Sequence, residues 1–368
     1  MKEKKKILLV SSGFYPEISP RSFRATELAK EFFRQGHDVT VISKYRNHDY
    51  SDFLKEFQIT FKMWNKSTFP VFRNFKQKSL AFICNGIARV LSVAFEYPVI
   101  EEMFLVSKVL KNETGYDLMI SFAVPYPVHW GVAKSKTKNH FIAKKWVADC
   151  GDPYMGDVLD SFRKPFYFGY LEKKFCKKAD FISIPVESAK TGYYPEFHHK
   201  IKIIPQGFDF NIEKDNKKTN SDNIPKFAYA GSFLRGIRDP EKLMKCLLRI
   251  NLPFKFYVFT DHPHKLIEYQ KVLGDKLIVS EYIPREELMT KLSEMSFLIN
   301  FDNNTTLNIP SKLIDYAISG RPVMNVDKNF TCADVYEFLN GDYGKRMLLP
   351  EPSQYHIKNV SQFFLDLI

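Results

Sequence analysis

The chain alternates short apolar runs with stretches of helical periodicity, and this alternation occurs in two separate blocks. Short apolar runs bounded by turn residues are typical of buried strands, and helical stretches between them are typical of crossovers in a parallel sheet. The runs are KILLVSSG, HDVTVIS, DLMISF, KKWVADC, ADFISIP and IKIIPQG in the first block, and FAYAGSF, FKFYVFT, KLIVSEYI, FLINFD and PVMNVD in the second. The pattern predicts an α/β protein with two doubly wound, Rossmann-like domains.

A polar stretch rich in Asn and Lys, residues 210–226, separates the two blocks and is typical of an interdomain connection. We therefore predict a first domain over residues 1–208 and a second over 209–352. A final helix over 353–368 is expected to pack back on the first domain. Ligands of such sheets bind at the carboxyl ends of the strands, so we expect the two domains to face a binding cleft.

The positive charge of the chain lies in its first half. Residues 1–208 carry 33 Lys and Arg against 21 Asp and Glu, whereas residues 209–368 carry 21 of each. Within the first half, Thr60–Leu80 mixes five basic residues with aromatic ones and has no acid. This composition suits an anionic membrane surface. Nucleic acid is less favoured because no recognised motif accompanies it, and a solvated basic loop remains the simple alternative.

Five cysteines lie far apart and form no Cys-x-x-Cys pair, which predicts reduced thiols in a cytoplasmic protein and no zinc site. The most apolar stretch, Leu80–Ile100, is interrupted by Arg89 and Glu96, so a membrane span is not expected. We find no P-loop, no GxGxxG and no nucleophile elbow, which disfavours P-loop NTPases, ordinary NAD dehydrogenases and hydrolases.

Two segments of the second block combine small and cationic residues after strands. YAGSFLRGIRDP follows one strand and offers Gly231, Ser232, Arg235 and Arg238. Small residues let the backbone approach an anion, and arginine binds phosphate oxygens through two N–H groups. By itself, the segment is equally compatible with a loop of solvated arginines.

IPSKLIDYAISGRPVM predicts a short helix capped by Ser311, with Lys312 and Asp315 together on its polar face. A helix start with free N–H groups and a lysine is suited to a phosphate, although a plain capped surface helix is the alternative. Both segments follow strands of one sheet, so we expect one pocket that stabilises a departing nucleoside diphosphate. The sequence has no Asp-x-Asp pair, and no metal ion or cofactor is expected.

The first block offers a histidine and an acid for proton transfer. His129 begins a predicted helix, and Asp149 and Asp152 follow the strand of WVADCGDP. Such side chains at strand ends can orient a hydroxyl group or accept its proton. A packed histidine and a turn or cap aspartate are the alternatives.

The ordered segments together resemble the glycosyltransferase family 4 enzymes of the GT-B fold over nearly the whole chain. They are SSGFYPEISPRSFRATELAKEFFRQGHDVTVIS, PVHWGVA, WVADCGDP, LEKKFCKKADFISIPVES, IKIIPQGFD, YAGSFLRGIRDP and IPSKLIDYAISGRPVM. The resemblance implies sugar transfer from a nucleotide-sugar donor, usually with retention and without a metal, by an acceptor domain followed by a donor domain.

The resemblance also implies residue roles. Arg238, Ser311 and Lys312 would bind the donor diphosphate and Asp315 the ribose, while Gly231, Ser232, Arg235 and Asn308 complete the donor site. Gly13 and Arg24 would lie on the acceptor side, and His129 and Asp152 at the reaction centre. The chain departs from the family where its Glu-x7-Glu pattern has Leu307 in place of the first glutamate. Asn303, Asn304 or Asn308 would have to replace that carboxylate, so the sugar is left open.

The function expected from these features is synthesis of a cell-surface polysaccharide such as capsule, O-antigen or exopolysaccharide. The expected acceptor is a saccharide, favoured as lipid-linked, at the cytoplasmic face of the membrane, where the enzyme would be peripheral. A soluble acceptor stays open. The rivals are a sugar-nucleotide epimerase of the same fold and a catalytically inactive nucleotide-binding protein; a nucleic-acid binder is a third, less favoured reading.

Overall fold

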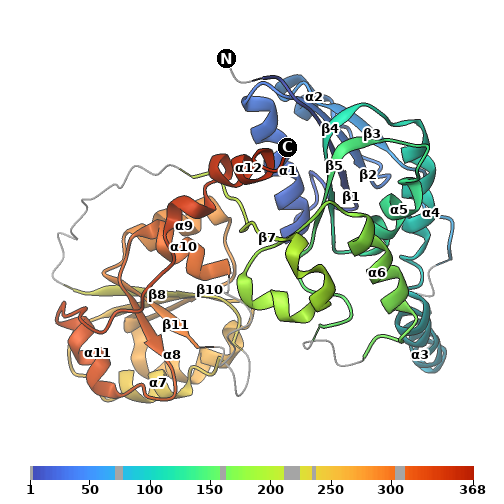
Figure 1. The fold of residues 1–368 in the computed structure, drawn as a ribbon. Helices are drawn as coiled ribbons and strands as arrows, with labels where there is room; N and C mark the ends of the chain where they lie inside the picture. The colour runs from blue at the N-terminus through green and yellow to red at the C-terminus, as the bar shows by residue number, and fades with distance from the viewer. Residues whose placement is uncertain (1–2, 71–77, 158–162, 211–223, 234–237, 303–310) are drawn as a thin grey trace. The chain divides into compact units, whose positions relative to one another are not determined.

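The protein divides into two compact units, each built on its own parallel sheet (Figure 1). The computed structural model describes residues 3–70, 78–157, 163–210, 224–233, 238–302 and 311–368. Unit 1 comprises residues 1–209 with 354–368, and unit 2 comprises residues 210–353.

Unit 1 has a seven-stranded sheet in the order β3-β2-β1-β4-β5-β6-β7. In chain order its strands are β1 (Lys6–Ser11), β2 (Asp38–Ser43), β3 (Thr60–Met63), β4 (Tyr116–Phe122), β5 (Ala143–Asp149), β6 (Phe181–Ile184) and β7 (Ile201–Ile203). Its helices are α1 (Pro20–Arg34), α2 (Ser51–Glu56), α3 (Lys78–Phe95), α4 (Glu101–Val109), α5 (Pro127–Ser135), α6 (Phe168–Lys178) and α12 (Ile357–Leu365). The sheet is covered on both faces, with α1 and α12 in one hydrophobic cluster and α4, α5 and α6 in the other.

Unit 2 has a five-stranded sheet in the order β10-β9-β8-β11-β12. Its strands are β8 (Lys226–Ala230), β9 (Lys255–Phe259), β10 (Leu277–Ser280), β11 (Phe297–Phe301) and β12 (Val323–Val326). Its helices are α7 (Glu241–Leu247), α8 (Ile267–Leu273), α9 (Arg285–Ser293), α10 (Ser311–Ser319) and α11 (Cys332–Leu339). Side chains of α7 and α11 pack on one face of the sheet, and those of α9 and α10 on the other.

All strand pairs within both sheets are parallel, as the apolar runs predicted. Strand order reverses between β1 and β4 in unit 1 and between β8 and β11 in unit 2. In open parallel sheets, the crevice beyond the carboxyl ends of the strands at such a reversal is the usual ligand site. The expected strands are all present, but β3 was not expected, because it lies in a stretch that had no strand pattern.

The last helix, α12, is part of the unit 1 core. Val360 and Phe364 are fully buried in the same hydrophobic cluster as α1. The chain before α12 also pairs with unit 1, because the Phe208 N–H donates to the Tyr355 carbonyl oxygen at 2.8 Å. Unit 1 is therefore completed by residues that follow unit 2 in the sequence.

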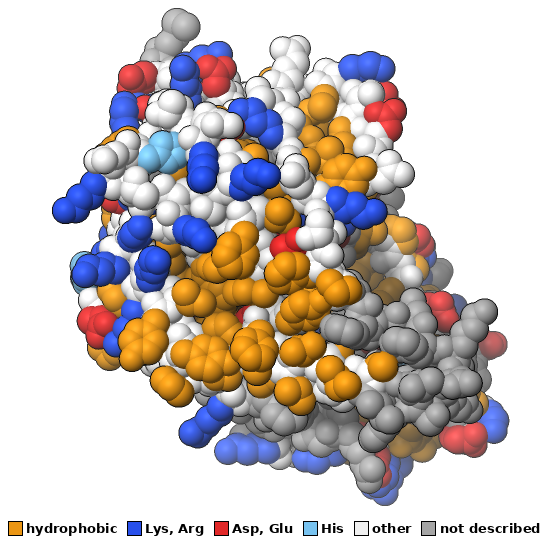
Figure 2. All heavy atoms as spheres, turned by 90° about the vertical axis from the view of Figure 1, so that its right-hand side faces the viewer, with side chains coloured by type: hydrophobic (Ala, Val, Ile, Leu, Met, Phe, Trp, Pro, Cys, Tyr) orange, Lys and Arg blue, Asp and Glu red, His pale blue; other side chains and the backbone are white. Residues whose placement is uncertain are grey.

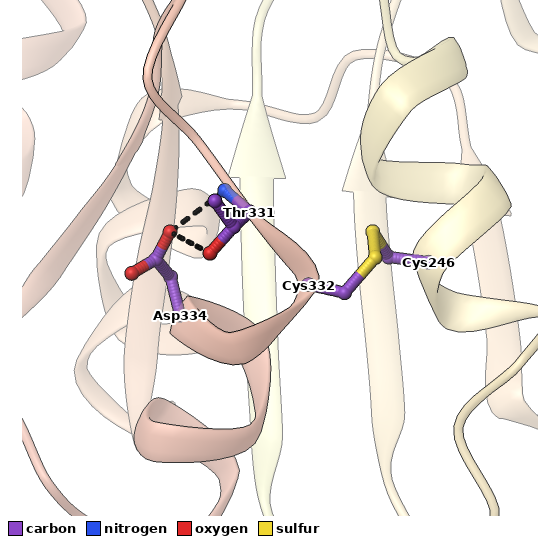
Figure 3. Close-up of a disulfide and its surroundings, with 4 residues drawn as sticks. All are labelled: Cys246, Thr331, Cys332 and Asp334. Atoms are coloured by element: carbon purple, nitrogen blue, oxygen red, sulfur yellow. Dashed lines mark hydrogen bonds between the residues drawn. A yellow bond between two sulfur atoms is a disulfide. The ribbon is translucent and has the colours of Figure 1, made fainter.

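One expectation about the cysteines is wrong. Cys246 of α7 and Cys332 of α11 form a disulfide with their Cα atoms 5.4 Å apart, while Cys84, Cys150 and Cys176 are free (Figure 3). The two partners are 86 residues apart, so their spacing in the sequence gave no sign of the pair. The adjacent turn is fixed as well, because the Asp334 carboxylate accepts from the N–H and the hydroxyl of Thr331 at 2.8 and 3.0 Å.

We expect the double variant Cys246→Ser/Cys332→Ser to lose about 2–4 kcal/mol of unfolding free energy in unit 2, because the crosslink restricts a long loop of the unfolded chain. Urea unfolding of the wild type with and without reductant, beside the double variant, measures this loss. The double variant itself should not respond to reductant. Equal midpoints for oxidised and reduced wild type would contradict the prediction.

Candidate functional site

The candidate site of unit 2 begins at Gly231, the glycine that directly follows β8. Gly231 has φ of +150°, a conformation that other residues rarely adopt, and its N–H donates to the Phe259 carbonyl at 2.9 Å. A Cβ atom placed at Gly231 would lie 3.0 Å from the Tyr229 hydroxyl and 3.7 Å from Lys312 Cδ. Glycine therefore lets the backbone pass close to the lysine at the strand reversal of the sheet.

Lys312, in the first turn of α10, lies beneath this loop. Its Nζ is 4.7 Å from the centre of the Tyr229 ring and has no hydrogen-bond partner within the described part of the chain. Burial, with a smaller contribution from the positive charge of Arg238, lowers the pKa of Lys312 to about 7. An ammonium group that is buried and has no carboxylate partner among the described residues is suited to bind an anion.

Helix α10 is held in place at this strand end by a tyrosine. Tyr316 is fully buried, and its hydroxyl accepts from the Ala230 N–H at 2.9 Å. The bond ties α10 to the last residue of β8, so Lys312 and Gly231 are fixed on the same edge of the sheet. Sequence reasoning placed Gly231 and Lys312 in one pocket, and the structure brings them together.

Asp315 lies one turn after Lys312 and is already paired. Arg285, at the start of α9, donates to Asp315 Oδ1 from Nε at 3.0 Å and from Nη2 at 2.7 Å. Burial raises the pKa of Asp315, and the guanidinium of Arg285 opposes that rise. Arg285 was not expected at the site, because it comes from a different strand connection.

Ser232 takes part in a polar cluster that sequence reasoning missed. Its hydroxyl contacts Asp261 Oδ2 at 2.9 Å and the Tyr282 hydroxyl at 2.9 Å. Tyr282 is 55% exposed, so its ring is available beside the loop that contains Gly231. The cluster adds an aromatic ring and a carboxylate to the cationic groups of this edge.

Some of the expected donor-site residues cannot be placed. Arg235, Leu307 and Asn308, with Asn303 and Asn304, lie outside the described residues. For Ser311 the structure gives its position as the first residue of α10. Arg238 is described, and its charge acts on both Lys312 and Tyr229.

A second candidate region is a cavity of about 240 Å³ in unit 1. It lies at the strand reversal between β1 and β4, and its lining is Ser12, Gly13, Glu17, Ser19, Arg21, Lys44, Tyr45, Arg46, Val124 and Pro125. Gly13 is packed closely there, because a Cβ atom would lie 3.1 Å from Ser22 Cβ of α1. Gly13, which is expected on the acceptor side, is thus one of the residues that line this cavity.

The cations of this cavity have carboxylate partners. Lys44 Nζ lies 2.8 Å from Glu102 Oε1, and Arg46 pairs with Glu17. Ser12 also donates to Glu102, at 3.1 Å. Alternating donors and acceptors of this kind suit a polyhydroxylated ligand.

Arg24 does not line the cavity and is a core residue. Its Nε and Nη2 donate to the two carboxylate oxygens of Asp149 at 2.6 and 2.7 Å, and both side chains are at most 3% exposed. Arg24 also donates to the carbonyls of Ile204 and Pro205 at 3.1 and 2.6 Å. Burial favours a raised pKa for Asp149, but Arg24, with smaller contributions from Arg21 and Ser183, outweighs it and holds the pKa of Asp149 below its usual value. The structure thus makes Arg24 a structural ion-pair partner, and the acceptor-side position expected for it is wrong.

His129 is also enclosed in the core of unit 1. It has no exposed surface, its Nδ1 lies within hydrogen-bond distance of the Ser121 hydroxyl at 2.8 Å, and its Nε2 lies 3.4 Å from Cys150 Sγ. The hydroxyl of Ser121 in turn accepts from Trp146 Nε1 at 2.8 Å. Burial lowers the pKa of His129 to about 3, so the imidazole is neutral. His129 is therefore a packed core histidine, the alternative to proton transfer that the sequence left open, and the geometry gives no support to a role at the reaction centre.

Asp152 is exposed and is not brought to His129. Its carbonyl oxygen accepts from the buried Tyr126 hydroxyl, which fixes the loop after β5. Within the described residues, no group of three or more His, Cys, Asp or Glu side chains is arranged to hold a metal ion.

Comparisons with known proteins identify the architecture. A glycosyltransferase from Rickettsia africae superposes with a TM-score of 0.60 at 13% identity, covering 99% of this chain and 97% of that one. The lipopolysaccharide outer core galactosyltransferase WaaB gives 0.55 at 11%, covering 98% of both chains. The UDP-GlcNAc 2-epimerase of Methanocaldococcus jannaschii gives 0.54 at 10%, covering 98% and 99%. No protein-family model and no curated protein matches the sequence.

These likenesses confirm the expected fold: the chain has the GT-B fold, with two Rossmann-like units. At such low identity they establish the fold alone, and both transferases and an epimerase are among the matches. The chemistry of this chain has to be inferred from its own residues.

Proposed function

We propose that this protein is a glycosyltransferase that binds a nucleotide-sugar through unit 2 and transfers the sugar to a saccharide acceptor. The observation that carries the proposal is Lys312, a half-buried lysine without a hydrogen-bond partner in the described part of the chain, in the first turn of α10. The donor diphosphate supplies the anion that this lysine lacks.

The chemistry follows from where charge develops. When the bond between the sugar and the diphosphate breaks, negative charge accumulates on the leaving oxygen. We propose that this charge is stabilised by Lys312, Arg238 and the N–H groups of α10. All of these groups belong to unit 2, so no movement between the units is needed to bring them to the leaving oxygen. Because fixed cations do this work, we propose that no metal ion is needed. The resemblance to family 4 adds retention of anomeric configuration, which NMR of the product tests.

The rest of the donor is assigned to the neighbouring groups of unit 2. Asp315, held by Arg285, is proposed to accept hydrogen bonds from the ribose hydroxyls. Ser232 and Gly231 are proposed to lie against the phosphates, where the glycine leaves room for the backbone to approach. Arg235, Ser311 and Asn308 remain proposed donor contacts by resemblance.

The acceptor is proposed to bind in unit 1, in the cavity that contains Gly13. Its mixture of paired cations, carboxylates and hydroxyls provides hydrogen bonds for sugar hydroxyl groups. We propose a lipid-linked saccharide of surface polysaccharide synthesis as the acceptor. The concentration of positive charge in residues 1–208 supports this choice, since it favours peripheral binding at an anionic cytoplasmic membrane face. Asp152, exposed after β5, is the remaining candidate for contact with the acceptor hydroxyl.

An epimerase is the second candidate, because an epimerase shares this fold. It would act on the donor alone, so incubation of the nucleotide-sugar without acceptor separates the two activities. An epimerase inverts one carbon of the sugar, whereas a transferase leaves the configuration of that carbon unchanged and at most hydrolyses the bond between sugar and nucleotide slowly. An inactive nucleotide-binding protein would bind the nucleotide and release neither product.

The proposal predicts that one nucleotide raises the melting temperature without a metal. Purified protein is screened by thermal shift against UDP, GDP, ADP, CMP and TDP, each with EDTA or with Mg²⁺. A ligand at 100 times its Kd stabilises the folded state by about 2.7 kcal/mol, an effect that is easily measured. Stabilisation by one nucleotide in EDTA is expected; a shift that requires Mg²⁺ contradicts metal independence, and no shift with any nucleotide contradicts the donor site.

A further inference from the structure

Helix α3 is apolar, yet it packs poorly on the protein. None of its described residues from Cys84 to Phe95 is buried, and Ile87, Val90 and Phe95 are 49%, 65% and 58% exposed. A helix on a globular protein normally buries its apolar stripe against the core. An apolar helix that stays on the surface requires another partner.

A second apolar segment lies beside the end of α3. Phe166 and Tyr170 are 80% and 73% exposed, and the intervening Tyr167 donates from its hydroxyl to the Ala94 carbonyl oxygen of α3. Figure 2 shows hydrophobic side chains gathered in a broad patch on this side of unit 1, with Lys and Arg side chains along its border. We call α3 residues 84–95 together with residues 166–170 the α3–α6 surface.

The charges around the α3–α6 surface are mostly positive because its carboxylates are withdrawn. Glu96 accepts from the Tyr154 hydroxyl at 2.6 Å and from Lys164 Nζ at 2.7 Å, and Glu172 of α6 is fully buried. By contrast, Lys174 and Lys177 of the same helix are exposed, while the exposed Lys173 pairs with Glu196 at 3.2 Å. Exposed rings and aliphatic groups beside exposed lysines are the combination that anionic lipid surfaces bind.

Within the described residues, no helix is both long and apolar enough to cross a bilayer. Helix α3 ends at Phe95, where Glu96 adopts a positive φ of 52°. An exposed apolar helix of this length with lysines beside it is suited to lie in the plane of the membrane surface, between headgroups and acyl chains.

We infer that the α3–α6 surface is the face by which this protein docks on an anionic bilayer, with its aromatic and aliphatic side chains inserted among the lipid headgroups. The inference rests on the proposed peripheral membrane binding and adds which surface makes the contact. It also moves the contact away from Thr60–Leu80, where β3 takes up Thr60–Met63 as a strand of the sheet. A second copy of the chain is a poorer partner, because the same face on both copies would bring its lysines together.

Sedimentation with vesicles tests the inference. Wild type and variants are mixed with vesicles of phosphatidylcholine alone or with phosphatidylglycerol added, and the bound fraction is measured at low and high salt. Val90→Asp should weaken binding to the anionic vesicles at least tenfold. Val272→Asp is the matched control, because Val272 of α8 is 73% exposed in unit 2, and it should bind like the wild type.

A second pair of variants compares an exposed apolar residue of the α3–α6 surface with an exposed apolar residue elsewhere. Phe166→Ser should also lose at least tenfold, whereas Leu348→Ser, at a residue 90% exposed in unit 2, should not. Unchanged vesicle binding of Val90→Asp and Phe166→Ser would overturn the inference. So would a wild-type dimer in solution that Val90→Asp dissociates while no vesicles are bound. The vesicle assay uses no nucleotide, so a negative result there does not affect the donor-site proposal. The thermal-shift screen uses no lipid, so a negative result there does not affect this inference.

Discussion

Lys312→Met is expected to reduce nucleotide stabilisation while making the unliganded protein more stable. Charge-assisted hydrogen bonds to phosphate contribute about 1.5–3 kcal/mol each, so the loss of the lysine should weaken nucleotide binding by about 10–100-fold. Titration calorimetry with the nucleotide found in the screen measures the affinity. Lys271→Met, at an exposed lysine of α8 that pairs with Glu268, is the control and should bind as the wild type does.

The gain in stability has a defined dependence on pH. The pKa of Lys312 is lowered to about 7 in the folded protein, against an ordinary value of 10.5. Between these values the unfolded chain binds more protons than the folded one, so wild-type stability rises with pH across this window. Lys312→Met should therefore gain roughly 1–3 kcal/mol below pH 7, and the gain should vanish by about pH 10.5.

The two effects of Lys312→Met are opposite in sign, which makes the experiment informative. A variant that is merely misfolded would lose stability and ligand binding together. A variant that binds nucleotide with wild-type affinity would remove the observation on which the donor site rests. In that case the loop at Gly231 would remain a tight turn without a ligand.

Asp149→Asn is expected to destabilise unit 1 by about 3–5 kcal/mol, because it leaves the Arg24 guanidinium buried without its counter-charge. Urea unfolding monitored by circular dichroism measures the loss. Since the pKa of Asp149 is lowered in the folded state, the contribution of the pair is present above the ordinary pKa of an aspartate and is lost as the pH falls through the folded value. The difference between wild type and variant should thus shrink in strong acid.

A double replacement shows whether the loss of stability in Asp149→Asn comes from the unpaired charge or from altered packing. Arg24→Met with Asp149→Leu removes both charges and keeps apolar volume, so it should recover part of the stability that Asp149→Asn loses. Recovery is not expected to be complete, because the carbonyls of Ile204 and Pro205 lose the donors that Arg24 supplies. Arg21 and Ser183 also lose the Asp149 carboxylate as their acceptor. An Asp149→Asn protein as stable as the wild type would contradict the structural role of this pair.

Local patterns in the sequence predicted the parallel strands and the start of α10 correctly, because both depend on residues close together along the chain. The closeness of Gly231 and Lys312 has a similar origin, since the ends of neighbouring strands of one sheet lie along the same edge. Arg24 was misjudged because its partner Asp149 is 125 residues away, and a buried ion pair has no local signature. His129 looked accessible because it follows a strand, yet Ser121 and Cys150 enclose it.

The exposure of α3 could not be predicted either. Its composition is that of a buried helix, and only the packing shows that residues 84–95 are left at the surface. Arg285 and Tyr282 were missed for a related reason, because each joins the unit 2 site from a connection with no recognisable motif. Sequence patterns identify helices and strands, but the contacts between side chains of different elements become known only from the three-dimensional structure.

The position of α12 in the core of unit 1 determines the order in which the chain can fold during synthesis. The ring of Phe364 packs 5.5 Å from the Arg24 guanidinium, and its neighbours on α12 cover α1. All of unit 2 leaves the ribosome before these residues do. Unit 2 can therefore reach its native state while unit 1 still exposes the apolar face of α1, and in that interval we expect the nascent chain to be prone to aggregation.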